Sequence, residues 1–337
     1  MIDVLLLALP QNFASGVVGA GDLLAVDRHF LRDMSGDPDD RTSTFNTRLT
    51  GPDQQVPTPF GPTLQLDCTL EDSGVADIVY IPPLAIFPGR ELECDPRIID
   101  WIRWQHDNGA VVCSACTGSL MLAATGLLDN RPATTHWAYM DDMRRAFPRV
   151  KVEPNRTLVV TGEGQRLVTA GGYASWHDLM LYLIHRFSGA EAARMVARFF
   201  LLDWHDVDQQ AYVCFRENLQ HSDDLVRRAQ LWLRQNLSHP TPVDAVITAS
   251  GLPQRSFLRR FRRSTGLTPV RYLQHLRVET AKSLLEESEK PVDQIAWAVG
   301  YEDPAYFRRI FRRITGLTPS AYRKTFRTPA HVADLMS

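Results

Sequence analysis

A short string of amino acids occurs twice in the last third of this chain. Residues 261–269 read FRRSTGLTP and residues 311–319 read FRRITGLTP, so eight of nine positions are identical at an offset of 50 residues. The stretches before them also repeat, at an offset of 49, as PVDAVITASG (residues 242–251) and PVDQIAWAVG (residues 291–300). A repeated unit of a short helix, a glycine turn and an arginine-rich helix predicts two tandem helix-turn-helix motifs.

The charged residues are divided unevenly along the 337-residue chain. Residues 222–337 carry 19 Lys and Arg against 11 Asp and Glu, whereas residues 1–221 carry 18 against 28. The overall charge of −2 therefore conceals a basic region and an acidic region. A basic region with two helix-turn-helix motifs favours double-stranded DNA as its partner, and the acidic region needs a different function.

Composition excludes several other classes of protein. The sequence has no apolar run near the roughly 18 residues that a membrane-spanning helix needs, so no membrane partner is expected. Residues 1–9 are apolar but lack the basic leader and cleavage site of a signal peptide, and they predict a buried strand. Five cysteines without regular spacing argue against a disulfide framework, and the reducing cytoplasm is the expected location. No cofactor is predicted, and no metal site either, because the ten histidines are scattered.

The N-terminal region alternates short apolar runs with amphipathic stretches. This alternation predicts an α/β domain with a mostly parallel sheet. Residues 33–62 are rich in Asp, Thr, Pro and Gly and are expected to be loop in part. The predicted strands are residues 4–9, 78–81, 111–114, 158–161 and 167–170, and the predicted helices are residues 98–107, 120–127, 176–187 and 190–202.

The C-terminal region is expected to be all α-helical. Ser222 is predicted to cap its first helix, Thr241 to cap the next, and Thr268 to start a long helix over residues 269–287. That helix would be about 28 Å long, enough to place two recognition helices in successive major-groove faces about 34 Å apart. The predicted domains are residues 1–187, a connector at 188–221, a DNA-binding domain at 222–327 and a tail at 328–337.

The second helix of each predicted motif carries a pair of phenylalanines and a row of arginines. Phe257 and Phe261, like Phe307 and Phe311, lie four residues apart and are expected to anchor the helix in a core. The arginines then face outward, where a guanidinium group matches the edge of guanine. The alternative is a solvated helix face, which two copies in register disfavour. The predicted DNA contacts are Arg255, Leu258, Arg259, Arg262, Arg263, Pro304, Ala305, Arg308, Arg309, Arg312 and Arg313, with Arg263, Arg312 and Arg313 assigned to phosphates.

These residues resemble the AraC/XylS family of transcription regulators. The match covers residues 225–327 and is most specific over residues 300–319, GYEDPAYFRRIFRRITGLTP. The resemblance implies a sequence-specific DNA-binding domain, commonly of an activator, with RNA polymerase as a possible further partner. Pro304 and Ala305 are short and apolar, so the second motif is expected to be less selective than the first.

The N-terminal region contains a candidate nucleophile. Residues 111–121 read VVCSACTGSLM, an apolar strand that runs into Cys-Thr-Gly and then a helix. This pattern is typical of a nucleophile elbow, which would place Cys116 exposed at the end of the strand. A thiol near a helix N-terminus has a lowered pKa, which favours the thiolate. The predicted ligand-binding residues are Cys116, Thr117, His136, Gly171 and Gly172, with the two glycines allowing close backbone approach.

This region resembles the DJ-1/PfpI family, a class I glutamine amidotransferase-like fold, over residues 1–187. The resemblance implies a flavodoxin-like, doubly wound sheet, and the two regions together are similar to the GlxA-type branch of the AraC regulators. That similarity implies a sensor and homodimerisation domain, often for small nitrogen-containing metabolites. Catalytic relatives pair the cysteine with an acidic residue after the first strand, whereas residues 9–18 here read LPQNFASGVV. Without that carboxylate no catalytic residue is assigned, and the chain is not expected to be an enzyme.

Three interpretations of the N-terminal region stay open. It is a ligand sensor with a pocket at Cys116 and His136, a domain that serves only dimerisation, or a hydratase- or amidase-type cysteine enzyme fused to a DNA-binding domain. Oxidation of Cys116 is a variant of the sensor hypothesis. The other expectations are that Cys113 faces the core, that Cys68, Cys94 and Cys214 are buried, that His29, His106, His185 and His205 are surface or packing residues, and that Trp101 and Trp104 pack.

Overall fold

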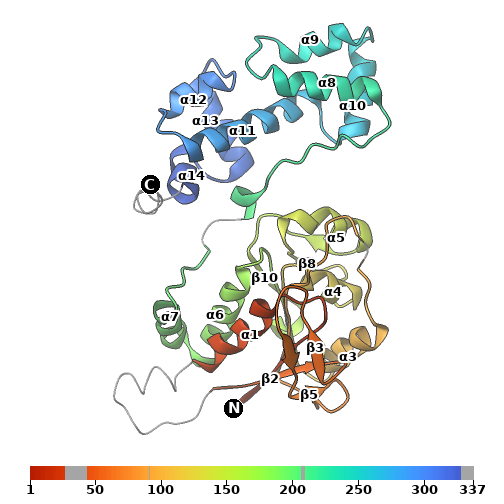
Figure 1. Cartoon of the computed structure of the whole chain (residues 1–337), viewed down its shortest axis with the longest axis vertical. Helices are drawn as coiled ribbons and strands as arrows, with labels where there is room; N and C mark the ends of the chain where they lie inside the picture. Colours follow the sequence, from red (N-terminus) through yellow and green to blue (C-terminus); the bar gives the residue numbers. More distant parts are fainter. Residues whose placement is uncertain (27–43, 91, 206–208, 328–337) are drawn as a thin grey trace. The chain divides into compact units, whose positions relative to one another are not determined.

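The computed structural model describes residues 1–26, 44–90, 92–205 and 209–327 (Figure 1). The chain divides into two compact units, Met1–Gln209 and Gln210–Ser337. The first unit is an α/β domain and the second is all helical, as the sequence predicts. Residues 33–43 of the expected loop, His29 and the tail at 328–337 lie outside the described residues.

A seven-stranded sheet forms the centre of the α/β unit. The strand order is β10-β11-β7-β6-β1-β2-β5, and every neighbouring pair is parallel except β10 and β11. This order confirms the predicted doubly wound, mostly parallel sheet. The strands are β1 (Ile2–Leu7), β2 (Phe45–Gly51), β5 (Cys68–Thr69), β6 (Ile78–Ile81), β7 (Val111–Ala115), β10 (Leu158–Thr161) and β11 (Leu167–Ala170).

Helices cover both faces of this sheet because its strands are apolar on both sides. Val4 and Leu6 of β1 belong to the hydrophobic cluster of one face, and Leu5 and Leu7 belong to the cluster of the other. The first face is covered by α1 (Ala14–Ala25), α6 (Ser175–Ser188) and α7 (Ala190–Phe199), and the second by α3 (Pro96–Asp107), α4 (Gly118–Ala124) and α5 (Met140–Ala146) (Figure 1). Two small sheets pair β3 (Gln55–Pro57) with β4 (Thr63–Gln65) and β8 (Pro132–Ala133) with β9 (Lys151–Val152).

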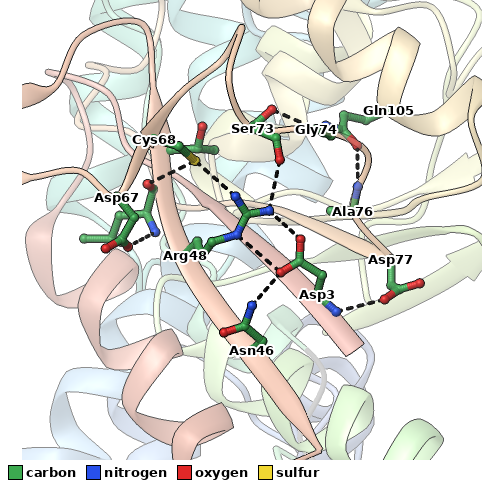
Figure 2. Close-up of polar contacts among 12 residues, drawn as sticks. Asp3, Asn46, Arg48, Asp67, Cys68, Ser73, Gly74, Ala76, Asp77 and Gln105 are labelled. Carbon is green, nitrogen blue, oxygen red and sulfur yellow. Dashed lines mark hydrogen bonds and ion pairs between the residues drawn. The ribbon is translucent and has the colours of Figure 1, made fainter. Parts of the chain in front are cut away.

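Strand β2 lies within residues 33–62 and is not among the strands predicted from the sequence. Its sequence, FNTRLTG, has no apolar run, and it forms a strand because it pairs with β1 along six residues. Figure 2 shows how its Arg48 is held: the guanidinium pairs with the carboxylate of Asp3 and donates to the carbonyl of Ser73 at 2.9 Å. The hydrogen bond with Asp3 raises the pKa of Arg48 above its ordinary value. A partly buried polar cluster therefore fixes the β1–β2 pairing.

Seven helices form the described part of the C-terminal unit. They are α8 (Asp224–Gln235), α9 (Pro242–Ala249), α10 (Gln254–Thr265), α11 (Pro269–Glu287), α12 (Val292–Ala298), α13 (Pro304–Thr315) and α14 (Pro319–Phe326). The long helix α11 begins and ends where the sequence predicts. Its first half supplies Tyr272 and Leu276 to one hydrophobic cluster, and its second half supplies Val278 and Leu285 to another. Each helix-turn-helix motif thus has its own core, and α11 belongs to both.

The predicted helix caps hold in one case out of three. Thr268 caps α11 by accepting from the N–H of Arg271 at 3.4 Å. The first helix is capped by Asp223, not by Ser222, because the Asp223 carboxylate accepts from the N–H of Val226 and also pairs with Arg260. Thr241 precedes α9 without a side-chain capping bond.

The expected connector, residues 188–221, is divided between the two units. Helix α7 packs on α6, and its Ala192 and Val196 lie in the core of the α/β unit. Beyond the boundary, the ring of Phe215 lies 5.2 Å from that of Tyr272 in the helical unit. Among the described helices, none is long and apolar enough to cross a membrane.

Candidate functional sites: two arginine-bearing helices and a cysteine elbow

The first candidate site is the outer face of α10. Phe257 and Phe261 are completely buried, so they anchor this helix as predicted. Leu258 is half-buried and packs against the same cluster, which corrects the expectation that it points away. The exposed residues are Arg255, Arg259, Arg262 and Arg263.

Helix α13 repeats this arrangement in the second motif. Phe307 and Phe311 are completely buried. The turn before the helix is one residue longer than in the first motif, and Asp303 caps the helix by accepting from the N–H of Ala305 at 2.8 Å. Pro304 is half-buried, and the exposed residues are Ala305, Arg308, Arg309, Arg312 and Arg313.

The two rows of arginines differ in how far their charges are compensated. Arg308 pairs with Asp293 of α12, and Arg313 donates to the side-chain oxygen of Gln274 at 2.8 Å. Arg309 stacks over the ring of Tyr306. Within the described parts of the chain, the four exposed arginines of α10 make no ion pair. Among the described residues, the exposed arginines of α10 are therefore less compensated by carboxylates than those of α13.

A concave surface accompanies the arginines of α13. A cavity of about 600 Å³ is lined by Arg308, Arg309, Arg312, Arg313 and Thr318. Four guanidinium groups around one open hollow suit phosphate oxygens, because guanidinium groups donate in pairs.

The second candidate site is the turn between β7 and α4 in the α/β unit. Cys116 has a backbone φ of +56°, a left-handed conformation that is uncommon outside glycine. Gly118 follows two residues later, where a Cβ would lie 2.6 Å from the carbonyl oxygens of Ile81 and Pro82. The predicted elbow is therefore present: a strained residue between a strand and a helix, with a glycine packed against the neighbouring strand.

The environment of Cys116 corrects the prediction of an exposed thiolate. The side chain is 5% exposed, and burial raises its pKa to about 11, although hydrogen bonds from Thr117 act in the opposite direction. The helix N-terminus therefore does not compensate for the loss of solvent. A thiol in this state is protonated at neutral pH and is a poor nucleophile.

The expected partners of Cys116 have other structural roles. The hydroxyl of Thr117 donates to the carbonyl of Leu84 and accepts from its N–H, both at 2.7 Å. The Nδ1 atom of His136 accepts from the N–H of Ala138 at 3.1 Å and so starts a 3₁₀ turn, η1 (Trp137–Tyr139). After β1, the buried side-chain amide of Asn12 holds the loop: its oxygen accepts from the N–H of Leu9, and its nitrogen donates to the carbonyl of Pro83.

The sequence pattern did not reveal the residue that lies closest to Gly171. The side chain of Gln209 lies against Gly171, and its amide bonds to Thr134, Thr135 and Arg156. Gln209 is in a polar stretch of the chain without a motif, so no pattern marked it. Thr134 and Thr135 lie in the string ATTHW, of which only His136 was predicted to bind a ligand.

Several single residues differ from expectation. Cys113 is completely buried, as predicted, whereas Cys68 and Cys94 are half-buried and Cys214 is exposed. Trp104 is 46% exposed and does not pack as Trp101 does. The imidazole of His205 lies 2.7 Å from the carboxylate of Asp178, a hydrogen bond that raises the pKa of His205. Within the described residues, no cluster of His, Cys, Asp and Glu is placed to hold a metal ion.

The fold and the sites define a two-domain protein in which a doubly wound α/β domain with a buried cysteine elbow precedes two helix-turn-helix motifs. Comparison with known families agrees. The DJ-1/PfpI family model matches residues 42–186, and a helix-turn-helix domain model matches residues 246–325. The chain belongs to the DJ-1/PfpI family and carries a C-terminal helix-turn-helix domain of the AraC type.

The chain is similar to several proteins of known name. The HTH-type transcriptional regulator CdhR of Pseudomonas aeruginosa is 30% identical over 64% of this chain and 63% of its own length. The HTH-type transcriptional regulator GlxA of Rhizobium meliloti is 28% identical over 57% of this chain and 58% of its own length. Isonitrile hydratase of Pseudomonas putida is 34% identical over 47% of this chain and 70% of its own length. The chain thus spans about three fifths of the length of these two regulators.

Proposed function

We propose that this chain is a sequence-specific DNA-binding transcription regulator whose α/β domain responds to a small molecule. The observation that carries the proposal is one geometry built twice. In each motif a buried phenylalanine pair holds a helix whose arginines face solvent, and α11 joins the two motifs. A solvated helix face would not require the same anchors and the same exposed arginines in both copies.

All of the proposed contacts are exposed side chains except Leu258 and Pro304, which are half-buried. Residues at the start and middle of each second helix read bases in the major groove, and residues near its end bind phosphates. Base reading is assigned to Arg255, Leu258, Arg259 and Arg262 in the first motif and to Pro304, Ala305, Arg308 and Arg309 in the second, and phosphate binding to Arg263, Arg312 and Arg313.

A DNA-binding measurement with one matched pair of variants tests the proposal. Selection from random duplex DNA should yield a consensus with two half-elements, and Arg259→Ala should weaken binding to it by about tenfold or more. The control is Arg194→Ala, which removes the same charge from an exposed site on α7 of the other unit and should leave affinity within about twofold. Equal losses in both variants, or no consensus from the selection, would reject sequence-specific binding.

The regulatory half of the proposal is a linkage. A ligand that favours one state of the protein raises or lowers DNA affinity only by its difference in affinity between the two states. The relatives named as transcriptional regulators support this half, as does an elbow whose thiol is protonated. We further propose a cytoplasmic homodimer with a small nitrogen-containing effector. A thermal-shift screen of amines, betaines and amino acids, followed by DNA titration with each hit, tests it; hits that leave DNA affinity unchanged would contradict the linkage.

A second function is favoured by one relative, the isonitrile hydratase, which is 34% identical over 47% of this chain. The left-handed turn at Cys116 is the feature that this candidate needs. Hydration of a simple isonitrile by the full chain, lost in Cys116→Ala while DNA binding is kept, would establish an enzyme fused to a DNA-binding domain. The buried, protonated thiol disfavours that result.

A further inference from the structure

The side chain of Gln209 is buried in the α/β unit although it lies in a stretch of the sequence without a recognisable motif. It is 3% exposed. Its amide lies over Gly171, the residue after β11, at the carboxyl edge of the sheet where ligands of doubly wound folds bind.

The groups around this amide complement both of its ends. Its Nε2 donates to the hydroxyl of Thr134 at 3.2 Å, the carbonyl of Thr135 at 3.0 Å and the carbonyl of Arg156 at 2.9 Å. Its Oε1 accepts from the N–H of Trp137 at 3.1 Å. A primary carboxamide has two N–H groups and one oxygen, so its two N–H groups share the three acceptors on one side and its oxygen meets the donor on the other. These four residues, Thr134, Thr135, Trp137 and Arg156, form with Gly171 what we call the amide cradle.

Gly171 is a glycine for a reason of space. A Cβ at this position would lie 2.0 Å from Nε2 of Gln209, closer than any contact permits. The backbone of Gly171 is outside the left-handed region, so its conformation does not itself require glycine. The missing side chain therefore serves the close approach of the amide.

The amide cradle adjoins the cysteine elbow. The hydroxyl of Thr135 donates to the carbonyl of Cys116 at 2.8 Å, and the N–H of Cys116 donates to the carbonyl of Ala170 at 2.9 Å. The next residue along the chain, Gln210, belongs to the helical unit. There its own amide donates to the carbonyls of Arg313 and Ile314 at 2.8 and 3.0 Å, at the end of α13.

We propose that the amide cradle is a binding site for a small primary carboxamide and that Gln209 is its internal occupant. An external carboxamide competes with Gln209 for the same donors and acceptors. The apparent affinity of such a ligand is lowered by the fraction of molecules in which Gln209 leaves the cradle open. Displacement of Gln209 frees the chain next to Gln210. We expect this release to change DNA affinity, a regulatory consequence that rests on the proposed function.

Ligand titration of the full chain by calorimetry or by ligand-observed NMR tests the site, with propionamide as the probe. Gln209→Ala opens the cradle and should bind propionamide about tenfold more tightly than the wild type. Gln209→Glu should do the same without leaving a cavity, because a carboxylate cannot donate to the carbonyls of Thr135 and Arg156. The same gain in affinity is expected from both variants, so a change caused only by altered folding of one variant can be recognised.

One control blocks the cradle in the protein, and the other removes the N–H donors from the ligand. In Gln209→Ala with Gly171→Ala, the new methyl group occupies the place of the amide nitrogen, and propionamide binding should disappear. The compound N,N-dimethylpropionamide lacks N–H groups and should not bind to Gln209→Ala. Equal affinity of wild type and both Gln209 variants, or equal binding of the dimethyl compound, would overturn the proposal.

DNA binding is measured separately so that the two proposals fail separately. Absence of DNA binding by the wild type would reject the regulator while leaving the carboxamide result intact. Carboxamide binding to the wild type without any change in DNA affinity would reject the regulatory consequence alone.

Discussion

At the scale of single residues, the two turn glycines of the helix-turn-helix motifs meet different constraints. Gly251 and Gly300 both have positive φ, +65° and +89°, a conformation that costs other residues about 1–2 kcal/mol. A Cβ on Gly251 would meet open space, whereas a Cβ on Gly300 would lie 2.4 Å from the carbonyl oxygen of Leu237. Glycine at position 251 is therefore favoured by backbone conformation alone, whereas glycine at position 300 is favoured by both conformation and lack of space.

Alanine substitutions at these glycines should differ in cost. Gly251→Ala should lower the free energy of unfolding by about 1 kcal/mol, from backbone strain alone. Gly300→Ala should lower it by roughly 2–4 kcal/mol, because the methyl group also forces the backbone of residue 237 to move. Urea unfolding followed by far-UV circular dichroism measures both, and equal losses would contradict the steric argument.

Cysteine reactivity gives a second prediction at the residue scale. Iodoacetamide at pH 7.5 should modify exposed Cys214 first and leave Cys116 unmodified, because Cys116 is buried and its pKa is raised to about 11. Peptide mass mapping at increasing times reads both sites, with the urea-unfolded chain as the reference for full labelling. Modification of Cys116 as fast as Cys214 would restore the thiolate and redox hypotheses.

At the scale of elements, α10 and α13 have the same buried phenylalanine anchors but differ in how their arginines are paired. Asp244 and Asp293 occupy equivalent places in the repeat, in the first turn of α9 and of α12. Only Asp293 is seen to pair with an arginine of the following helix, among the residues that the structure describes. A carboxylate held against Arg308 competes with DNA for that arginine.

Removing each carboxylate should therefore have unequal effects. Asp293→Asn should tighten DNA binding more than Asp244→Asn does, by about two- to fivefold, because it also releases Arg308 from an exposed ion pair. The affinity of both variants should be measured at several salt concentrations, where Asp293→Asn should also steepen the salt dependence. Identical gains from the two substitutions would mean that the ion pair does not restrain Arg308.

At the scale of the whole molecule, one pair of polar contacts fastens the last described stretch of the α/β unit before residue 206. The last described stretch of the α/β unit before residue 206 is attached through His205, whose N–H donates to Asp178 at 2.9 Å while its ring bonds to the other oxygen. That hydrogen bond raises the pKa of His205, and the nearby Asp178 and Asp203 charges act in the same direction against burial.

This contact should make the stability of the α/β unit depend on pH, with a larger contribution at low pH than at high pH. A raised folded-state pKa adds stability that is complete below the ordinary value of 6.5 and is lost as pH rises through the raised pKa. The difference in melting temperature between wild type and His205→Gln should therefore be larger at pH 5.5 than at pH 8.5. A difference that grows with pH would contradict the assignment.

Much of the fold could be predicted from the sequence because its signals are local. Strands with apolar side chains on both faces, such as 78–81 and 167–170, and the helix over 269–287 appear where the patterns place them. Strand β2 could not be predicted, because its polar sequence becomes a strand only by pairing with β1. The cap at Asp223 was missed for a related reason: its partner Arg260 comes from another helix.

The candidate sites divide in the same way. The arginine rows and their phenylalanine anchors follow from helical spacing, which the repeat displays twice. The elbow was also visible, since Cys-Thr-Gly after a strand requires a tight turn. Its chemistry was not visible, because the pKa of Cys116 depends on how much protein covers it. Gln209 could not be predicted at all, since the groups that bind it come from residues 134–156, far away in sequence.

The sequence by itself determined the class of the protein, the two helix-turn-helix motifs and the place of the elbow, because each depends on residues within one or two turns of the chain. Only the tertiary structure decided that Cys116 is buried, that Arg308 is already paired and that Gln209 fills a cradle beside Gly171. Solvation and hydrogen bonding depend on which distant segments of the chain pack together, and short-range sequence patterns do not contain that information.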